Sequence, residues 1–167
     1  FIEKNNTNQL GIRMENGEAN QITTYKMNLM DLNQDNISIP PIQFESVITL
    51  PSNNFQKICR DMFNLSDNIE ITTYGQQITF KCKGDIADQE TSIGESQTSG
   101  MSFIKQENTE IIQGIFSLKY LVLFTKCTNL SSSIELYLKN DYPLIIRYQV
   151  ANLGEVKLCL APVSLHD

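Results

Sequence analysis

The residues able to make and break bonds are few and scattered. The single histidine, His166, stands one residue before the C-terminal end of the sequence. The four cysteines form no C-x-x-C pair; they are Cys59, Cys82, Cys127 and Cys159. A Ser-His-Asp site, a Cys-His site and a zinc site that needs histidine are therefore disfavoured. We expect reduced thiols buried as small apolar side chains, with no metal and no cofactor.

Paired carboxylates are the other candidates for chemistry. Asp31 lies near Asp35, and Asp85 lies near Asp88, so each pair could share general acid and base work. Both pairs fall in polar stretches of loop composition, where solvated carboxylates are the better interpretation. A small α+β enzyme that uses Asp85 or Glu90 is an alternative, and it predicts a concave site with converging acids.

Basic residues gather on two predicted helices, residues 52–65 and residues 117–127. Pro51 and Ser52 are start signals for the first helix. The side chains predicted to be buried are Phe55, Ile58, Cys59 and Met62 on the first helix, and Phe116, Tyr120, Leu121, Leu123, Phe124 and Cys127 on the second. The cations predicted to point away from these apolar faces are Lys57, Arg60, Lys119 and Lys126. From the residues alone, a plain solvated face is the favoured interpretation.

The chain as a whole is acidic. Its 13 Lys+Arg and 19 Asp+Glu give a net charge of −6, with a pI near 4.8. A protein that grips nucleic acid with its whole surface is usually basic, so that class is excluded. A small basic face toward DNA is compatible with this charge.

The remaining pattern favours an α+β class built on antiparallel sheet. The 167 residues are 41% hydrophobic and 19% charged, which is a globular composition. Predicted strands are residues 12–14, 21–27, 45–50, 69–73, 78–83, 110–116, 133–139, 143–150 and 156–160. No apolar run reaches the roughly 18 residues of a membrane span. Residues 29–44 are interpreted as a linker, residues 85–100 as an edge strand or loop, and the start at Phe1 suggests a fragment or a processed chain.

Colinear motifs give the sequence a specific resemblance. They are L-M-D-L at residues 29–32, I-S-I-P at 37–40, an aromatic at Phe44, L-P-S-N-N-F-Q-K-I-C-R-D at 50–61, S-Q-T-S at 96–99, L-K-Y-L-V-L-F-T-K at 118–126, L-S-S at 130–132, P-L-I-I-R-Y at 143–148 and L-A-P at 160–162. Together they resemble the C-terminal part of the sliding DNA clamp family of proliferating cell nuclear antigen. The match runs from about Gln9 through nearly the whole chain.

The resemblance implies the DNA clamp fold, with antiparallel sheets outside and two helices lining an inner face. It divides the chain into closing strands of an incomplete first domain at residues 1–28, an interdomain connector at 29–46, a C-terminal domain at 47–163 and a tail at 164–167. It implies a homotrimeric ring of the full-length protein around double-stranded DNA. The ring slides without reading sequence and acts without catalysis. The cations expected to face DNA are Lys57, Arg60, Lys119 and Lys126.

The resemblance also implies a groove for client proteins. DNA polymerase, flap nuclease, ligase and clamp loader dock there through short motifs with a Gln and two aromatics. The matching residues are Ile37, Ile39, Pro40, Phe44, Pro143, Ala161 and Pro162. A client strand is expected to pair with the tail near residues 161–164. Many relatives carry an aromatic where this chain has Cys159, so a wider pocket or a different anchor is expected.

A ring seam is the third implied site. Residues 20–27 are expected to pair edge to edge with roughly residues 91–98 of a neighbouring copy. The seam residues are Ile22, Tyr25, Met62, Leu65, Ser92 and Ile93. The implied location is the nucleus, or a cytoplasmic replication factory for a large DNA virus. Alternatives are a checkpoint-type clamp subunit that forms mixed rings and an interaction module without a DNA role.

Overall fold

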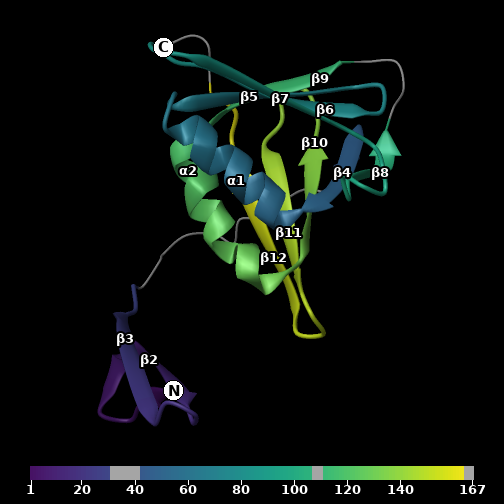
Figure 1. Ribbon diagram of the computed structural model, residues 1–167. Helices are drawn as coiled ribbons and strands as arrows, with labels where there is room; N and C mark the ends of the chain where they lie inside the picture. Colours follow the sequence, from purple (N-terminus) through teal and green to yellow (C-terminus); the bar gives the residue numbers. More distant parts are fainter. Residues whose placement is uncertain (31–41, 107–110, 164–167) are drawn as a thin grey trace. The chain divides into compact units, whose positions relative to one another are not determined.

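The computed structural model describes residues 1–30, 42–106 and 111–163 (Figure 1). The chain divides into two compact units, Phe1–Pro41 and Ile42–Asp167.

The first unit is a three-stranded antiparallel sheet in the order β1-β2-β3. Its strands are β1 (Ile2–Glu3), β2 (Asn6–Asn16) and β3 (Gln21–Asn28). The ring of Phe1 covers Gly11, where a Cβ atom would come within 2.5 Å of that ring. Most other apolar side chains of the sheet are exposed, among them Ile12, Ile22 and Tyr25. This sheet therefore buries little apolar surface by itself.

The second unit packs two antiparallel sheets and a helical layer around one core. The five-stranded sheet has the order β12-β11-β10-β4-β8, and the four-stranded sheet has the order β7-β6-β5-β9. The elements are β4 (Ser46–Pro51), α1 (Ser52–Phe63), β5 (Asn68–Tyr74), β6 (Gln77–Lys83), β7 (Asp88–Gly94), β8 (Ser102–Gln106), β9 (Ile112–Ser117), α2 (Leu118–Phe124), the 3₁₀ helix η1 (Thr125–Leu130), β10 (Ser133–Leu138), β11 (Leu144–Val150) and β12 (Gly154–Leu160). The predicted α+β class is confirmed.

The core follows from strict alternation along the strands. In β5, Ile69, Ile71 and Thr73 are buried, while the residues between them are at least partly accessible. The turn from β5 to β6 contains Gly75 at a φ of +57°, a left-handed conformation that suits glycine. Helices α1 and α2 lie side by side (Figure 1). Helix α1 contacts β4 and β10, and α2 contacts β5 and β9, so the helical layer closes the core against both sheets.

Candidate functional site

Exposed cations mark the outer surface of the helical layer. Lys57 and Arg60 are exposed on α1, Lys119 is exposed on α2, and Lys126 is exposed on η1. Within the described parts of the chain, no ion pair engages any of the four. The ammonium group of Lys119 lies 6.0 Å from the ring centroid of Tyr120. Asp61 is the sole acidic residue of these helices, so the surface carries a local positive excess in an acidic chain.

Specific hydrogen bonds fix the helices that carry these cations. The side-chain amide of Gln56 on α1 donates to the carbonyl of Thr125 at 2.8 Å, joining α1 to η1. The hydroxyl of Ser52 at the start of α1 donates to the carbonyl of Ser131 at 2.5 Å. Phe55 is fully buried beneath α1. The cations therefore stand on a packed and bonded layer.

The buried face of the second helix differs from the prediction. Leu118 and Leu121 are fully buried, whereas Tyr120 and Leu123 are 48% and 46% exposed. The α-helix ends at Phe124, and the chain continues as the 3₁₀ helix η1, which has fewer residues per turn. Phe116 belongs to β9 and Cys127 to η1, so a helical face drawn through Phe116, Tyr120, Leu123 and Cys127 joins three different elements. That face therefore assigns Tyr120 and Leu123 to the wrong side of α2. The predicted exposure of the lysines is confirmed, and the two apolar side chains share their surface.

The outward face of the five-stranded sheet carries an apolar row. Strand register places Tyr137 beside Val47 on one flank and Ile145 on the other, with Cys159 next to Ile145. The ring of Phe44 meets Tyr137 edge-on, with centroids 5.4 Å apart. Because the residues before and after each of these positions along β4, β10 and β11 are buried in the core, the row itself faces away from the helices.

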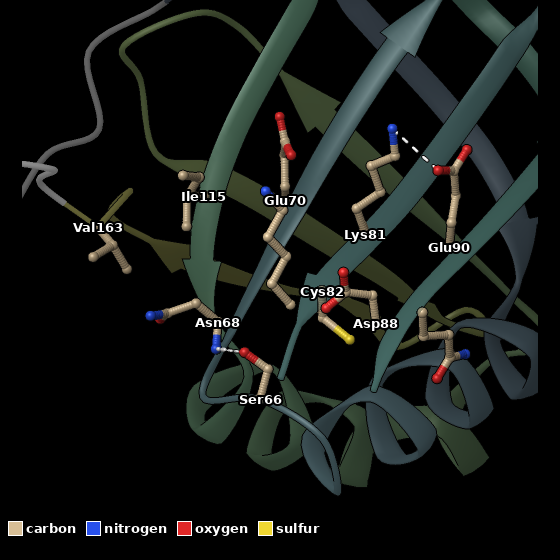
Figure 2. A pocket seen from close by; sticks show the side chains of 11 residues that line it. Ser66, Asn68, Glu70, Lys81, Cys82, Asp88, Glu90, Ile115 and Val163 are labelled. Carbon is tan, nitrogen blue, oxygen red and sulfur yellow. Dashed lines mark hydrogen bonds and ion pairs between the residues drawn. The ribbon is translucent and has the colours of Figure 1, made fainter. Parts of the chain in front are cut away.

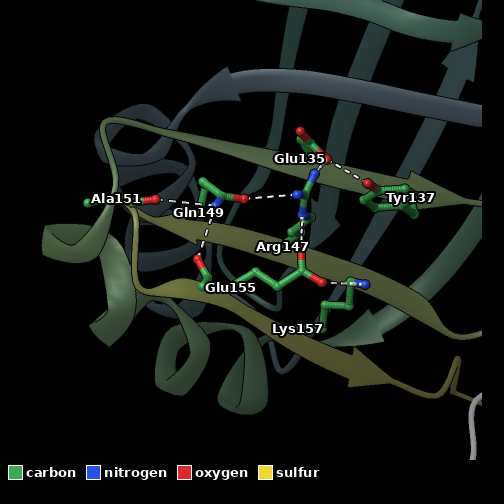
Figure 3. A network of polar contacts seen from close by, with 8 residues as sticks. Glu135, Tyr137, Arg147, Gln149, Ala151, Glu155 and Lys157 are labelled. Atoms are coloured by element: carbon green, nitrogen blue, oxygen red, sulfur yellow. Dashed lines mark hydrogen bonds and ion pairs between the residues drawn. The ribbon is translucent and has the colours of Figure 1, made fainter.

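A polar network lies beside the apolar row (Figure 3). Arg147 Nη1 is 2.8 Å from Glu135 Oε2, and its Nε is 2.6 Å from Glu155 Oε2. Arg147 Nη2 donates to Gln149 at 2.8 Å. The hydroxyl of Tyr137 donates to Glu135 at 2.5 Å. One arginine thus ties β10, β11 and β12 together and links them to the apolar row through Tyr137.

The network shifts the acidity of its members. Burial acts to raise the pKa of Glu135, but hydrogen bonds from Tyr137 and Arg147 outweigh it and lower the pKa below the ordinary 4.5. Hydrogen bonds from Lys157 and Arg147 lower the pKa of Glu155. Burial, with the bond to Glu135, raises the pKa of Tyr137. Both carboxyl groups therefore stay ionised at neutral pH, as a structural network requires.

The residues predicted for the client groove are only partly within the described chain. Ile37, Ile39 and Pro40 lie outside the described residues. Phe44 is half-buried against Tyr137, Pro143 and Ala161 are exposed, and Pro162 is half-buried. Phe44 lies in the segment before β4 and Pro143 in the turn before β11. Ala161 and Pro162 lie in the segment after β12.

The segment after β12 is already engaged in one place. The backbone N–H of Val163 donates to the carbonyl of Ile115 on β9 at 2.8 Å. That donor is not free for a client strand in this structure. The expected pairing of a client with residues 161–164 is therefore restricted at Val163, and Ser164 lies outside the described residues.

The predicted seam residues fall into exposed and buried groups. Ile22 and Tyr25 on β3 are 58% and 53% exposed, and Ser92 on β7 is exposed. Met62 is fully buried and Ile93 nearly so, both in the main core. These two side chains therefore pack inward, which corrects their expected place at a seam. The helix phase aligns Met62 with the buried face of α1, and strand alternation turns Ile93 inward when Ser92 points out.

A hollow of about 700 Å³ lies over the outward face of the four-stranded sheet (Figure 2). Glu70, Lys81 and Glu90 are aligned across its strands, and Lys81 Nζ is 3.1 Å from Glu90 Oε2. The carboxylate of Glu90 is thus held by a neighbouring cation at an exposed position. This arrangement does not favour the alternative of an enzyme with Glu90 as an acid or base.

In the part of the chain that the structure describes, the cysteine thiols and the possible metal ligands form no further functional site. Cys59 and Cys82 are buried, Cys127 is half-buried and Cys159 is exposed, all as free thiols. The expectation of buried thiols is therefore wrong for Cys159, which lies on the outward row of β12. Among described residues, no group of three or more His, Cys, Asp or Glu could hold a metal ion. No helix there has the length and apolarity to cross a membrane.

Three residues on the outward face of the five-stranded sheet, one of them buried, are not among the predicted site residues. Tyr137 and Ile145 belong to the apolar row, and Arg147 organises the network beside it. Period-two alternation in β10 and β11 could have identified them as outward residues. Their proximity to Cys159 and Phe44 required the strand order, which the sequence does not state.

Comparison with known proteins identifies the family. A family model described as proliferating cell nuclear antigen, C-terminal domain, matches residues 38–163. The two-sheet, two-helix unit described above corresponds to that stretch. The chain belongs to the proliferating cell nuclear antigen family.

Curated relatives extend over most of this chain. A protein named probable DNA polymerase sliding clamp 1, from Paramecium bursaria Chlorella virus 1, is 35% identical over 164 residues, which is 96% of this chain and 62% of the relative. Proliferating cell nuclear antigen of Chaetomium thermophilum is 32% identical over 159 residues, covering 92% of this chain and 60% of the relative. The chain spans about three fifths of the length of these relatives.

Proposed function

We propose that this chain is part of a sliding DNA clamp that encircles double-stranded DNA and holds replication enzymes on it. The observation that carries the proposal is the set of exposed cations on α1, α2 and η1, which have no ion-pair partner among the described residues, in a chain of net charge −6. Family membership and the name of the viral relative support it. The clamp works without catalysis or a cofactor, because a closed ring needs only to remain threaded.

The proposed DNA contacts are those of Lys57, Arg60, Lys119 and Lys126 with phosphates. Such contacts carry no sequence information, and each is weak enough to exchange as the ring moves. Tyr120 lies on the same surface, so this surface combines positive charge with apolar area. The acidic remainder of the protein repels DNA elsewhere and favours the basic surface as the meeting point.

A homotrimer closed by strand pairing is the proposed assembly. Strand β3 ends one sheet and β7 ends another, so each offers an edge that can accept a strand. Exposed Ile22 and Tyr25 on β3 add apolar surface that would be covered in the seam. Ser92 and Leu65 are the proposed contacts on the β7 side.

Client docking is proposed on the outward face of the five-stranded sheet. In the row, half-buried Tyr137 and exposed Cys159, with half-buried Phe44, supply apolar surface for aromatic anchors above the buried Val47 and Ile145. Ile37, Ile39 and Pro40, with Pro143, Ala161 and Pro162, complete the proposed site. The proposed clients are DNA polymerase, flap nuclease, ligase and clamp loader, acting in the nucleus or at a viral replication site.

The decisive experiment reverses charge on α2 and η1. Lys119→Glu with Lys126→Glu should sharply reduce the length of DNA that a polymerase copies per binding event on a primed circular template with its clamp loader. The control, Lys4→Glu with Lys83→Glu, changes net charge equally at two exposed positions outside α1, α2 and η1. Unchanged synthesis by the first variant would refute the DNA role and support an interaction module.

A further inference from the structure

The two edges of the four-stranded sheet differ in what covers them. Strand β9 forms one edge and β7 forms the other. At β9, the side chain of Asn140 makes two hydrogen bonds to the strand backbone. Its Oδ1 accepts from the N–H of Gln113 at 2.9 Å, and its Nδ2 donates to the carbonyl of Ile111 at 3.0 Å.

The side-chain amide of Asn140 makes the hydrogen bonds that a neighbouring strand would make. A paired strand supplies one acceptor and one donor to alternate residues of an edge, and Asn140 supplies both. Val163 continues the cover by donating to the carbonyl of Ile115 at 2.8 Å. Ile111, Gln113 and Ile115 alternate along the chain, so their bonded groups lie on the same side of β9. That edge is therefore occupied by a side chain and one backbone group.

Asn140 is itself held in place. It lies in the connection between β10 and β11, where its backbone N–H donates to Glu45 at 3.4 Å. The ammonium group of Lys139 is 3.8 Å from the same carboxylate. The following residue, Asp141, has a φ of +61° and turns the chain toward β11. The amide is thus presented by a defined turn.

The β7 edge contrasts with this arrangement. Within residues 1–30, 42–106 and 111–163, no strand lies beyond β7. Near its end, the hydroxyl of Ser99 donates to the carbonyl of Gly94 at 2.9 Å. Exposed strand edges can pair with strands of other molecules unless they are covered.

We propose that Asn140 determines which edge of the sheet associates with another copy of this chain. Because Asn140 bonds the carbonyl of Ile111 and the N–H of Gln113, it prevents strand addition at β9 and confines association to β7. The inference rests on the ring assembly proposed above, because it assigns Asn140 the task of excluding the wrong strand pairing. The partner concerned is a second copy of the chain, and the effect is on assembly specificity.

The test compares self-association of the 167-residue chain without DNA. Asn140→Ala should give a weight-average mass that rises with concentration beyond that of the unsubstituted chain, in sedimentation velocity. Amide exchange of Gln113 should accelerate at low concentration and slow again as the variant associates. Asn129→Ala removes an exposed amide from η1 and should sediment like the unsubstituted chain.

A second substitution identifies the edge involved. Gln113→Pro added to Asn140→Ala removes the freed donor without breaking the pairing of β9 with β5, because this N–H points away from β5. The extra association should disappear. If Asn140→Ala does not fold, Asn140→Ser carries the same prediction, since a hydroxyl cannot reach both backbone groups.

Normal sedimentation of a folded variant with an exchanging Gln113 amide would overturn the proposal. Persistence of the extra association in the double variant would also overturn it, since another surface would be responsible. Neither result depends on DNA, so failure here is separate from failure of the clamp function in the charge-reversal experiment.

Discussion

The ring of Phe44 stands edge-on to the ring of Tyr137, with centroids 5.4 Å apart. This contact joins the segment before β4 to the outward face of β10. Because Tyr137 occupies the centre of the apolar row, the contact couples the end of the proposed connector to the surface on which clients are proposed to dock.

Removing the Tyr137 ring should weaken client binding. An aromatic pair between the Tyr137 ring and a client aromatic would contribute about 0.5–1.5 kcal/mol beyond its buried area, so Tyr137→Ala should reduce the affinity of a Gln-and-aromatic peptide several-fold. Tyr137→Phe keeps the ring and removes only the hydrogen bond to Glu135. It should bind nearly as the unsubstituted chain in titration calorimetry. Equal affinity of all three proteins would place the peptide site elsewhere.

The phase of the second helix can be tested with two leucines. Leu121 is fully buried, and Leu123 is 46% exposed. Leu121→Ala should lower the free energy of unfolding by about 2–5 kcal/mol. Leu123→Ala should change it by about 0.5 kcal/mol or less. Urea unfolding followed by circular dichroism measures both, and a reversed order would restore the face predicted from a single α-helical period.

Acid should weaken the network around Arg147. The folded chain holds Glu135 below its ordinary pKa of 4.5, so near that pH the unfolded chain binds more protons. The stabilisation is therefore present at neutral pH and declines as pH falls below about 5. Glu135→Gln should flatten this decline in urea midpoints measured from neutral to acid pH. The same slope in both proteins would show that other carboxyl groups govern acid sensitivity.

Thiol reactivity should follow burial. Desolvation raises the pKa of Cys59 to about 12, which keeps the reactive thiolate scarce. Cys159 is exposed. Brief iodoacetamide treatment of the folded chain should label Cys159 first and leave Cys59 unlabelled, as read by peptide mass spectrometry. Labelling of Cys59 at the same rate would contradict the packing beneath α1.

Salt dependence should report the proposed phosphate interactions. Removing one cation that neutralises a phosphate lowers the slope of log affinity against log salt by about one. Lys119→Ala with Lys126→Ala should therefore reduce that slope by about two in anisotropy measurements with duplex DNA. Lys81→Ala with Lys83→Ala should leave it unchanged. An equal reduction by both pairs would mean that DNA responds to net charge rather than to the helical surface.

Local patterns predict much of the second unit. Apolar alternation identifies β5 and β6, and the start signals at Pro51 and Ser52 predict the beginning of α1. Residues 85–100 fit either an edge strand or a loop by composition, and β7 fills their middle. Only residues 12–14 of the extended strand β2 are predicted, because most of the remaining residues of the strand are polar and exposed.

Other features depend on non-local contacts. Strand β8 lacks a sequence signal because its five residues are mostly polar or exposed and its pairing with β4 contains a bulge between Val47 and Ile48. The sequence does not signal the change from α2 to η1 either, because the pattern of residues 117–127 fits a single longer helix. The apolar row around Tyr137 arises only because β4 adds beside β10, far along the chain.

The hydrogen bond from Gln56 to Thr125 has a mechanical consequence for the proposed ring. With α1 joined to η1, the backbone positions that carry Lys57, Arg60 and Lys126 keep a constant spacing whichever stretch of polyanion lies opposite. A surface of constant spacing cannot tighten around one arrangement of phosphates. The resistance to sliding would then be the same along the duplex, and the ring would not be slowed at any particular position.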